Sequence, residues 1–219
     1  MLKAVLFDMD GVIVDTEPLH HKAYHMMFND YNIEVSKELY ESFTGQSTIN
    51  VCKKLVNHFN LNSDPEDLVL CKRSHFNGLF DFDESLKLLP GVLELIKNYY
   101  MNGLTLVLAS SASMGTINKV FKRFDLDQYF VAKLSGADLK ASKPHPEIFI
   151  KAAKAAKQPA ENCIVIEDST NGLKAAIGAN IFCIGYDSLH SKNQDYSFAN
   201  LKTRTFEAIH YEKIKDILS

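Results

Sequence analysis

Residues 1–11 read MLKAVLFDMDG, a short apolar run that ends in two acidic residues and a glycine. Three more apolar runs follow at 104–109 (LTLVLA), 163–166 (CIVI) and 181–184 (IFCI). These runs are apolar throughout rather than at every second position, which is typical of strands buried on both faces of a sheet. Helical patterns lie between them. We therefore predict a doubly wound α/β fold built on a parallel sheet.

The segment after the first apolar run breaks this alternation. Residues 16–80 contain several helical patterns and no convincing strand, and the last of these patterns runs from Pro65 to Phe80. We therefore expect an inserted α-helical domain at 16–80. The core domain would then consist of residues 1–15 and 81–219.

The composition gives no support for a nucleic-acid or membrane partner. The chain of 219 residues carries a net charge of −3, so any bound anion must be held by local chemistry. No apolar run reaches the roughly 18–20 residues that cross a bilayer. Asp8 and Asp10 interrupt the first run where a signal peptide needs a longer one. We expect a cytoplasmic protein, with a monomer as the default.

The cysteines and most histidines show no metal-binding pattern in the sequence. Cys52, Cys71, Cys163 and Cys183 are scattered and form no Cys-x-x-Cys pair, which argues against a zinc site or a disulfide framework. We assign no role to the following histidines: His21, His25, His58, His75, His190 and His210.

Polar side chains gather where the apolar runs end. The residues at these ends are Asp8, Asp10, Ser110, Ser111, Glu167 and Asp168. Lys143 lies between the second and third of these ends, in the turn Ser-Lys-Pro-His-Pro. In an open parallel sheet, ligands bind beyond the carboxyl ends of the strands. We therefore expect these side chains to meet at one edge of the sheet.

This set of side chains suits phosphoryl transfer. Clustered carboxylates repel one another unless a cation joins them, and an all-oxygen set favours a hard ion such as Mg²⁺. One carboxylate can attack phosphorus to form an aspartyl-phosphate, and a second carboxyl group can protonate the leaving alcohol. Ser110 can donate to a non-bridging phosphate oxygen, and Lys143 can stabilise the charge of the transition state.

Four motifs carry a resemblance to a known family. They are Asp8-x-Asp10-Gly11-Val12, Ser110 after an apolar run, Lys143-Pro144-x-Pro146, and Glu167-Asp168-Ser169-x-x-Gly172. In their order and spacing they resemble the haloacid dehalogenase superfamily. The resemblance spans nearly the whole chain and is greatest to the beta-phosphoglucomutase-like subgroup of sugar-phosphate phosphatases and mutases.

The resemblance implies a Rossmann-like core with a helical cap domain, and it implies roles for individual residues. Asp8 would be the nucleophile and Asp10 the acid/base. The ligands of Mg²⁺ would be Asp8, the main-chain carbonyl of Asp10, Glu167 and Asp168. In the cap, His20 and Lys72 match positions that contact the acid/base residue or the substrate phosphate in the mutase.

The predicted cap loop favours a phosphatase over a mutase. The mutase pattern has a lysine before the loop glycine and an arginine three residues after it, whereas this chain has Thr44 before Gly45 and Thr48 after it. Two lost charge-assisted contacts weaken the anchor for a second phosphate, although hydroxyls of Thr44, Ser47 or Thr48 can partly substitute. We predict a Mg²⁺-dependent phosphatase of small, sugar-phosphate-like esters, with a beta-phosphoglucomutase as the alternative.

A signalling receiver module is the best alternative from another class. Such modules also phosphorylate an aspartate at a strand end, with magnesium, a hydroxyl group and a lysine. A receiver is much shorter, has no inserted helical domain and takes its aspartate from a later strand. The polar stretch at 188–197 is loop-like, and the sequence assigns it no role.

Overall fold

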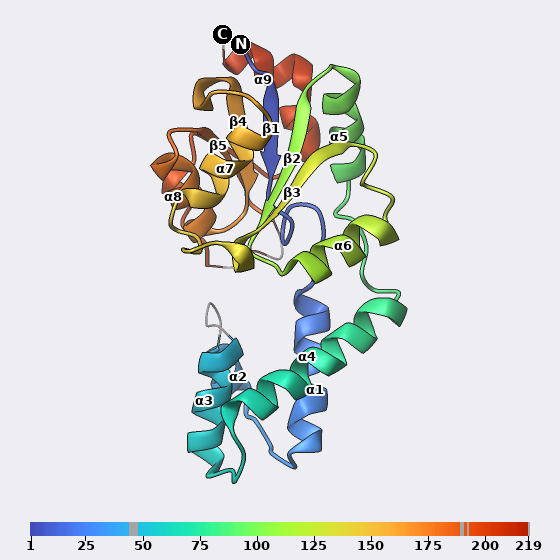
Figure 1. Cartoon of the computed structure of the whole chain (residues 1–219), viewed down its shortest axis with the longest axis vertical. Coiled ribbons are helices and arrows are strands. Elements are labelled where there is room, and N and C mark those ends of the chain that lie inside the picture. The colour runs from blue at the N-terminus through green and yellow to red at the C-terminus, as the bar shows by residue number, and fades with distance from the viewer. Residues whose placement is uncertain (44–47, 189–190, 192, 219) are drawn as a thin grey trace. The chain divides into compact units, whose positions relative to one another are not determined.

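The computed structural model describes residues 1–43, 48–188, 191 and 193–218 (Figure 1). The chain divides into two compact units. The core unit consists of Met1–Asp15 and Lys87–Ser219, and the helical unit consists of Thr16–Leu86.

A six-stranded parallel sheet forms the centre of the core unit, with the strand order β3-β2-β1-β4-β5-β6. The strands are β1 (Ala4–Phe7), β2 (Thr105–Ser110), β3 (Phe130–Ser135), β4 (Cys163–Glu167), β5 (Phe182–Tyr186) and β6 (Leu201–Thr203). The predicted doubly wound α/β class is therefore confirmed. The four predicted apolar runs form β1, β2, β4 and β5. The two edge strands β3 and β6 were not predicted from the sequence, because β3 is mixed in polarity and β6 has only three residues.

Helices cover both faces of this sheet. They are α5 (Val92–Met101), α6 (Met114–Arg123), α7 (Glu147–Ala155), α8 (Thr170–Gly178) and α9 (Tyr211–Ile217). Successive side chains of a strand point to opposite faces. Accordingly, Leu6 of β1 belongs to a buried cluster with α7 and α8, whereas the ring of Phe7 packs against Tyr99 of α5 at 6.2 Å between centroids. Figure 1 shows α5 on one side of the sheet and α7 and α8 on the other.

The described residues of the helical unit form four helices and no strand. The helices are α1 (Glu17–Asp30), α2 (Lys37–Glu41), α3 (Thr48–Phe59) and α4 (Pro65–Phe82). They enclose a core of their own, in which Met27 and Phe28 of α1 pack with Leu55 of α3 and Leu68 of α4. None of the helices in the described parts of the chain is both long enough and apolar enough to cross a bilayer.

The second junction between the units lies after Leu86, whereas the sequence suggested residue 80. No glycine or proline stops α4 between Phe80 and Leu89, so the helix continues to Phe82. Leu88 then forms an isolated antiparallel bridge with Val14, which ties the returning chain to the segment after β1.

Candidate active site

Three carboxylates meet at the carboxyl ends of β1 and β4. The parallel register pairs Phe7 with Ile166, and the Asp8 N–H donates to the main-chain oxygen of Ile166 at 3.0 Å. Asp8 and Glu167 therefore leave neighbouring strands side by side, and Asp168 follows directly. Carboxylate oxygens of Asp8, Glu167 and Asp168 all lie within 4.8 Å of one another. This edge is where the strand order changes direction, the usual position of a binding site in such sheets.

Lys143 reaches into this cluster from the turn before α7. Its side chain is only 5% exposed. The ammonium group has three N–H groups. It donates to Asp8 Oδ1 at 2.5 Å, to Glu167 Oε1 at 2.9 Å and to the main-chain oxygen of Ala109 at 3.0 Å. Lys143 thus joins the ends of β1, β2 and β4 through one buried cation.

The three carboxylates of this cluster outnumber the single ammonium group of Lys143. Burial raises the pKa of Asp8 to about 7; the Lys143 charge lowers this pKa, and the Glu167 charge raises it further. Burial, together with the charges of Glu167 and Asp8, raises the pKa of Asp168 to about 8. Burial alone would lower the pKa of Lys143, but the charges of Asp8 and Glu167 hold it above its usual range. Such a set of oxygens is stabilised by a further cation.

Two glycines of the sequence motifs allow the carboxylates to approach the backbone. Gly11 has a φ of +80°, and a Cβ there would lie 1.9 Å from Asp168 Oδ2. A Cβ on Gly172, in the first turn of α8, would lie 1.7 Å from Glu167 Oε1. Any side chain at either position would displace a carboxylate of the cluster.

The remaining core candidates lie near the same edge. Asp10 is half-buried in the turn after β1, and its charge contributes to the raised pKa values of Asp8 and Asp168. Ser110 is the last residue of β2 and is 1% exposed, and its Oγ accepts from the Ala112 N–H at 3.1 Å. Ser111 is exposed.

Two residues of the polar stretch at 188–197 contact Asp168, which was not predicted from the sequence. The Ser191 hydroxyl donates to Asp168 Oδ2. The Tyr196 hydroxyl lies 2.9 Å from the main-chain oxygen of Asp168 and 3.1 Å from that of Tyr186, and donates to these carbonyls. This stretch follows β5, the neighbour of β4 in the sheet. Its position after that strand was the only sequence feature that could have indicated contacts with Asp168.

The helical unit brings two of its candidate residues together. Lys72 is 3% exposed, and its Nζ lies 2.5 Å from His20 Nδ1. The His20 ring stacks on Phe76 at 4.3 Å, and Lys72 Nζ lies over the rings of Tyr24 and Phe76 at 4.9 and 5.1 Å. Burial lowers the pKa of Lys72 to about 8. Burial and the Lys72 charge lower the pKa of His20 to about 3, so His20 is a neutral acceptor near pH 7.

The predicted cap-loop residues are only partly described. Thr48 begins α3, is half-buried and forms a side-chain hydrogen bond with Tyr24. Thr44, Gly45 and Ser47 lie outside the described residues.

Residues 2–180 match a family described as haloacid dehalogenase-like hydrolase. Among the relatives, a phosphorylated carbohydrates phosphatase from Thermotoga maritima is 32% identical over 192 residues, which cover 88% of this chain and 88% of the relative.

Solved structures resemble the whole chain. CbbY from Rhodobacter sphaeroides, in complex with phosphate, has a TM-score of 0.84 at 25% identity and covers 98% of this chain and 100% of its own. A beta-phosphoglucomutase from Clostridium difficile has a TM-score of 0.78 at 27% identity and covers 100% of this chain and 97% of its own. The similarities span the core unit and the helical unit alike.

Proposed function

Because this chain belongs to the haloacid dehalogenase-like hydrolases, we propose that it is a Mg²⁺-dependent phosphatase of small, sugar-phosphate-like esters, with Asp8 as nucleophile. One observation carries the proposal. Asp8 lies at the end of the central strand, hydrogen-bonded to the buried cation of Lys143 and flanked by two further carboxylates. That arrangement holds a carboxylate ready to attack an anionic group.

The residues at this edge fit Mg²⁺. Their donors are all oxygens, they are close together, and the three carboxylates outnumber the one ammonium group of Lys143 beside them. Asp8, Asp168 and the main-chain carbonyl of Asp10 would hold the ion. Glu167 would add charge beside them, with its two oxygens bonded to Lys143 and Ser169. When bound, Mg²⁺ supplies positive charge that keeps the carboxylates ionised and allows a phosphate to approach.

In the first half-reaction, a carboxylate oxygen of Asp8 bonds to phosphorus as the bond from phosphorus to the ester oxygen breaks. Asp10 gives its proton to that ester oxygen, so the leaving group departs as a neutral alcohol. Lys143 offsets the charge around Asp8, and Ser110 would donate to a non-bridging oxygen. The neighbouring Ser111 would assist in binding the phosphate.

In the second half-reaction, Asp10 takes a proton from water as the water oxygen bonds to phosphorus. The bond between Asp8 and phosphorus breaks, which releases inorganic phosphate and restores the Asp8 carboxylate. Asp10 is again protonated and ready for the next ester. One residue therefore serves as acid in the first step and as base in the second.

We further propose that the helical unit acts as the cap of this enzyme, excluding water and selecting the leaving group during turnover. Lys72 would contribute a positive charge to the substrate phosphate, and neutral His20 would orient it. Thr48, with Thr44 and Gly45 before it, would contact the rest of the substrate. The uncharged pair of threonines supports water, rather than a second sugar hydroxyl, as the acceptor of the phosphoryl group.

Phosphate release from a panel of sugar phosphates tests this function. We expect release that requires Mg²⁺ and stops with a chelator. Asp8→Asn should lower kcat by about 10⁴-fold or more, as loss of a nucleophile typically does. Asp138→Asn, which changes an exposed carboxylate of the same unit, is the matched control. Turnover that survived Asp8→Asn would overturn the nucleophile assignment.

A beta-phosphoglucomutase is the second candidate, favoured by the likeness to the Clostridium difficile mutase over both units. The two functions differ in the acceptor of the phosphoryl group. Beta-glucose 1-phosphate supplied with a catalytic amount of a sugar bisphosphate separates them. Conversion to glucose 6-phosphate much faster than phosphate release would establish the mutase, whereas phosphate release as the main product supports the phosphatase.

A further inference from the structure

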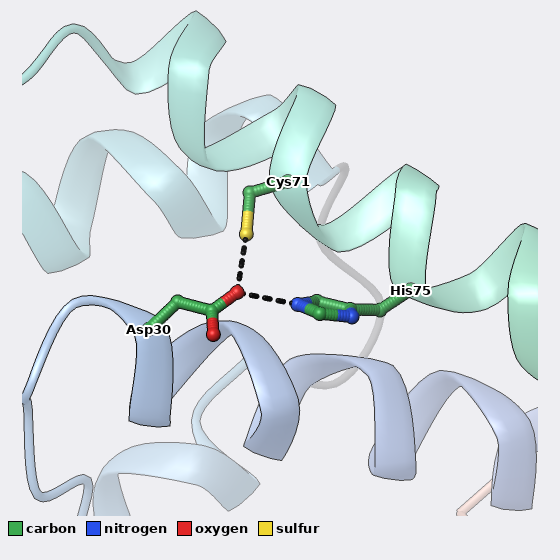
Figure 2. Close-up of side chains that lie close together, drawn as sticks. All are labelled: Asp30, Cys71 and His75. Atoms are coloured by element: carbon green, nitrogen blue, oxygen red, sulfur yellow. Dashed lines mark hydrogen bonds and ion pairs between the residues drawn. The ribbon is translucent and has the colours of Figure 1, made fainter.

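Three potential metal ligands of different chemistry meet on the helical unit (Figure 2). Asp30 is the last residue of α1, and Cys71 and His75 lie on α4. Asp30 Oδ2 accepts a hydrogen bond from Cys71 Sγ at 3.2 Å and lies 2.5 Å from His75 Nε2. A sulfur, a nitrogen and an oxygen ligand atom from these residues all lie within 4.8 Å of one another.

The two helices hold this set in place. Cys71 and His75 are four residues apart on α4, so their side chains project from the same face of the helix. Both face Asp30 in Figure 2. The α1–α4 pair packs through the buried core of the helical unit, and Cys71 itself contacts that core. The convergence of the three side chains therefore follows from packing within one compact unit.

The cluster is open enough for an ion to enter. The Asp30 side chain is 51% exposed and that of His75 is 23% exposed, while Cys71 is half-buried. Hydrogen bonds from His75 and Cys71 lower the pKa of Asp30, so it is a carboxylate. Burial raises the pKa of the Cys71 thiol to about 11, so the thiol is protonated near pH 7 until a metal replaces its proton.

We propose that Asp30, Cys71 and His75 form a binding site for Zn²⁺ or a similar transition-metal ion, separate from the carboxylate cluster of the core unit. Thiolate, imidazole and carboxylate are the ligands that Zn²⁺ takes, whereas Mg²⁺ prefers oxygen alone. A water molecule would complete four-coordination, as in zinc sites with three protein ligands.

Binding changes the protonation of the Cys71 thiol. The Cys71 thiol releases its proton to solvent and binds as thiolate. His75 would bind through Nε2 and carry a proton on Nδ1, and Asp30 would bind through its carboxylate. Each bound ion therefore releases one proton. The ion would link the end of α1 to the middle of α4, and would stabilise the helical unit because the ligands meet only in its folded form.

This site was not predicted from the sequence, because the cysteines lack Cys-x-x-Cys spacing. The pairing of Cys71 with His75 is a helix spacing, and Asp30 joins them only through the packing of α1 on α4. A pattern search along the chain therefore passes over both the cysteine and the histidine.

Titration with Co²⁺ in excess Mg²⁺ tests the proposal. Co²⁺ stands in for Zn²⁺ and gives a thiolate-to-cobalt charge-transfer absorption, which the oxygen ligands of the core unit do not produce. We expect this absorption to saturate at one equivalent and to disappear when Zn²⁺ is added. Cys71→Ser and His75→Gln should each weaken Co²⁺ binding by more than about 100-fold, because even the outer-sphere partners of a metal contribute 10- to 100-fold.

Matched controls separate this site from the other thiols and imidazoles. Cys163→Ser changes a buried thiol of the core unit, and His58→Gln changes an exposed imidazole on α3. Both should leave the absorption and its one-equivalent end point unchanged. Circular dichroism without metal checks that each variant is folded. Absence of the charge-transfer absorption in the unmodified protein, or its persistence in folded Cys71→Ser, would overturn the site.

Discussion

Among the described residues, each unit buries one lysine, and the two lysines respond to burial in opposite ways. Their side chains are almost equally inaccessible. Lys143 donates to the carboxylates of Asp8 and Glu167, and its pKa is held above its usual range. Lys72 instead lies against aromatic rings and the neutral His20, and burial lowers its pKa to about 8. The charged partner, rather than burial, decides the charge of a buried amine.

The difference shows what each unit lacks. The core unit holds several carboxylates around one lysine, so it gains stability from another cation. The helical unit holds Lys72 with little compensation beyond the charge of Glu17, so it gains stability from an anion. The proposed Mg²⁺ would supply the cation that the core unit lacks.

Within the comparison of the two lysines, the largest effect should come from removing Lys143. Lys143→Met leaves Asp8 and Glu167 buried without their hydrogen-bonded cation. Breaking a buried pair in this way typically costs about 3–5 kcal/mol of the free energy of unfolding. The rate of phosphate release should fall by about 10³-fold, as it does when a main electrostatic contact is lost. Denaturant unfolding and steady-state assays measure the two effects.

Lys140→Met is the control for this change, because Lys140 is exposed and lies in the same loop. It should alter neither stability nor turnover appreciably. If Lys143→Met were as stable and active as Lys140→Met, the ion pairs around Lys143 would not hold the carboxylates together, and the contrast with Lys72 would have no energetic basis.

A glycine in each unit sharpens the comparison further. Gly172→Ala places a Cβ 1.7 Å from Glu167 Oε1, so the carboxylate must move away from Lys143. Overpacking of this kind should cost about 1–3 kcal/mol of the free energy of unfolding and reduce turnover. Gly78→Ala in α4 meets nothing within 4 Å and should raise stability by about 0.5–1 kcal/mol, because alanine favours helix. Equal effects from the two changes would contradict the tight packing around Glu167.

Much of the core unit could be predicted from the sequence, because its signals are local. An uninterrupted run such as LTLVLA has few structural alternatives to a buried strand. Such runs correctly predicted four strands: β1, β2, β4 and β5. The parallel topology then brought Asp8, Lys143 and Glu167 to one edge. The catalytic roles assigned to these residues stay predictions.

The features that the sequence did not predict depend on contacts between distant segments. Ser191 reaches Asp168 only because the stretch after β5 lies beside the end of β4, and nothing in its polar composition indicates that contact. The environment of Lys72 is likewise set by α1, which supplies His20 and Tyr24. A lysine within α4 has no local signal that distinguishes it from a solvated one.

Lys72 should destabilise the helical unit while its ammonium group is charged. The pKa of Lys72 is about 8 in the folded chain against its ordinary value of 10.5, so between these values the unfolded state binds more protons and stability rises with pH. Below about pH 8, Lys72→Met should therefore be more stable than the unmodified protein by about 3 kcal/mol. The advantage should shrink as the pH rises toward 10.5. Denaturant unfolding at several pH values measures the difference.

Lys54→Met provides the control, because Lys54 is an exposed residue of α3 in the same unit. Its difference from the unmodified protein should be small and independent of pH. A Lys72→Met variant less stable than the unmodified protein near pH 7 would mean that Lys72 is compensated after all, and the two lysines would then be alike.

The smallest effect concerns the neutral donors around the carboxylates of the core unit. Tyr196→Phe removes the hydroxyl that donates to the main-chain oxygen of Asp168, which should cost about 1 kcal/mol of stability. The Mg²⁺ concentration for half-maximal phosphate release should rise by about 10-fold, because partners that orient a ligand contribute to metal affinity. Tyr100→Phe, which removes an exposed hydroxyl, should change neither value. An unchanged Mg²⁺ requirement in Tyr196→Phe would mean that the Ser191 hydroxyl and the end of β4 position Asp168 without the tyrosine.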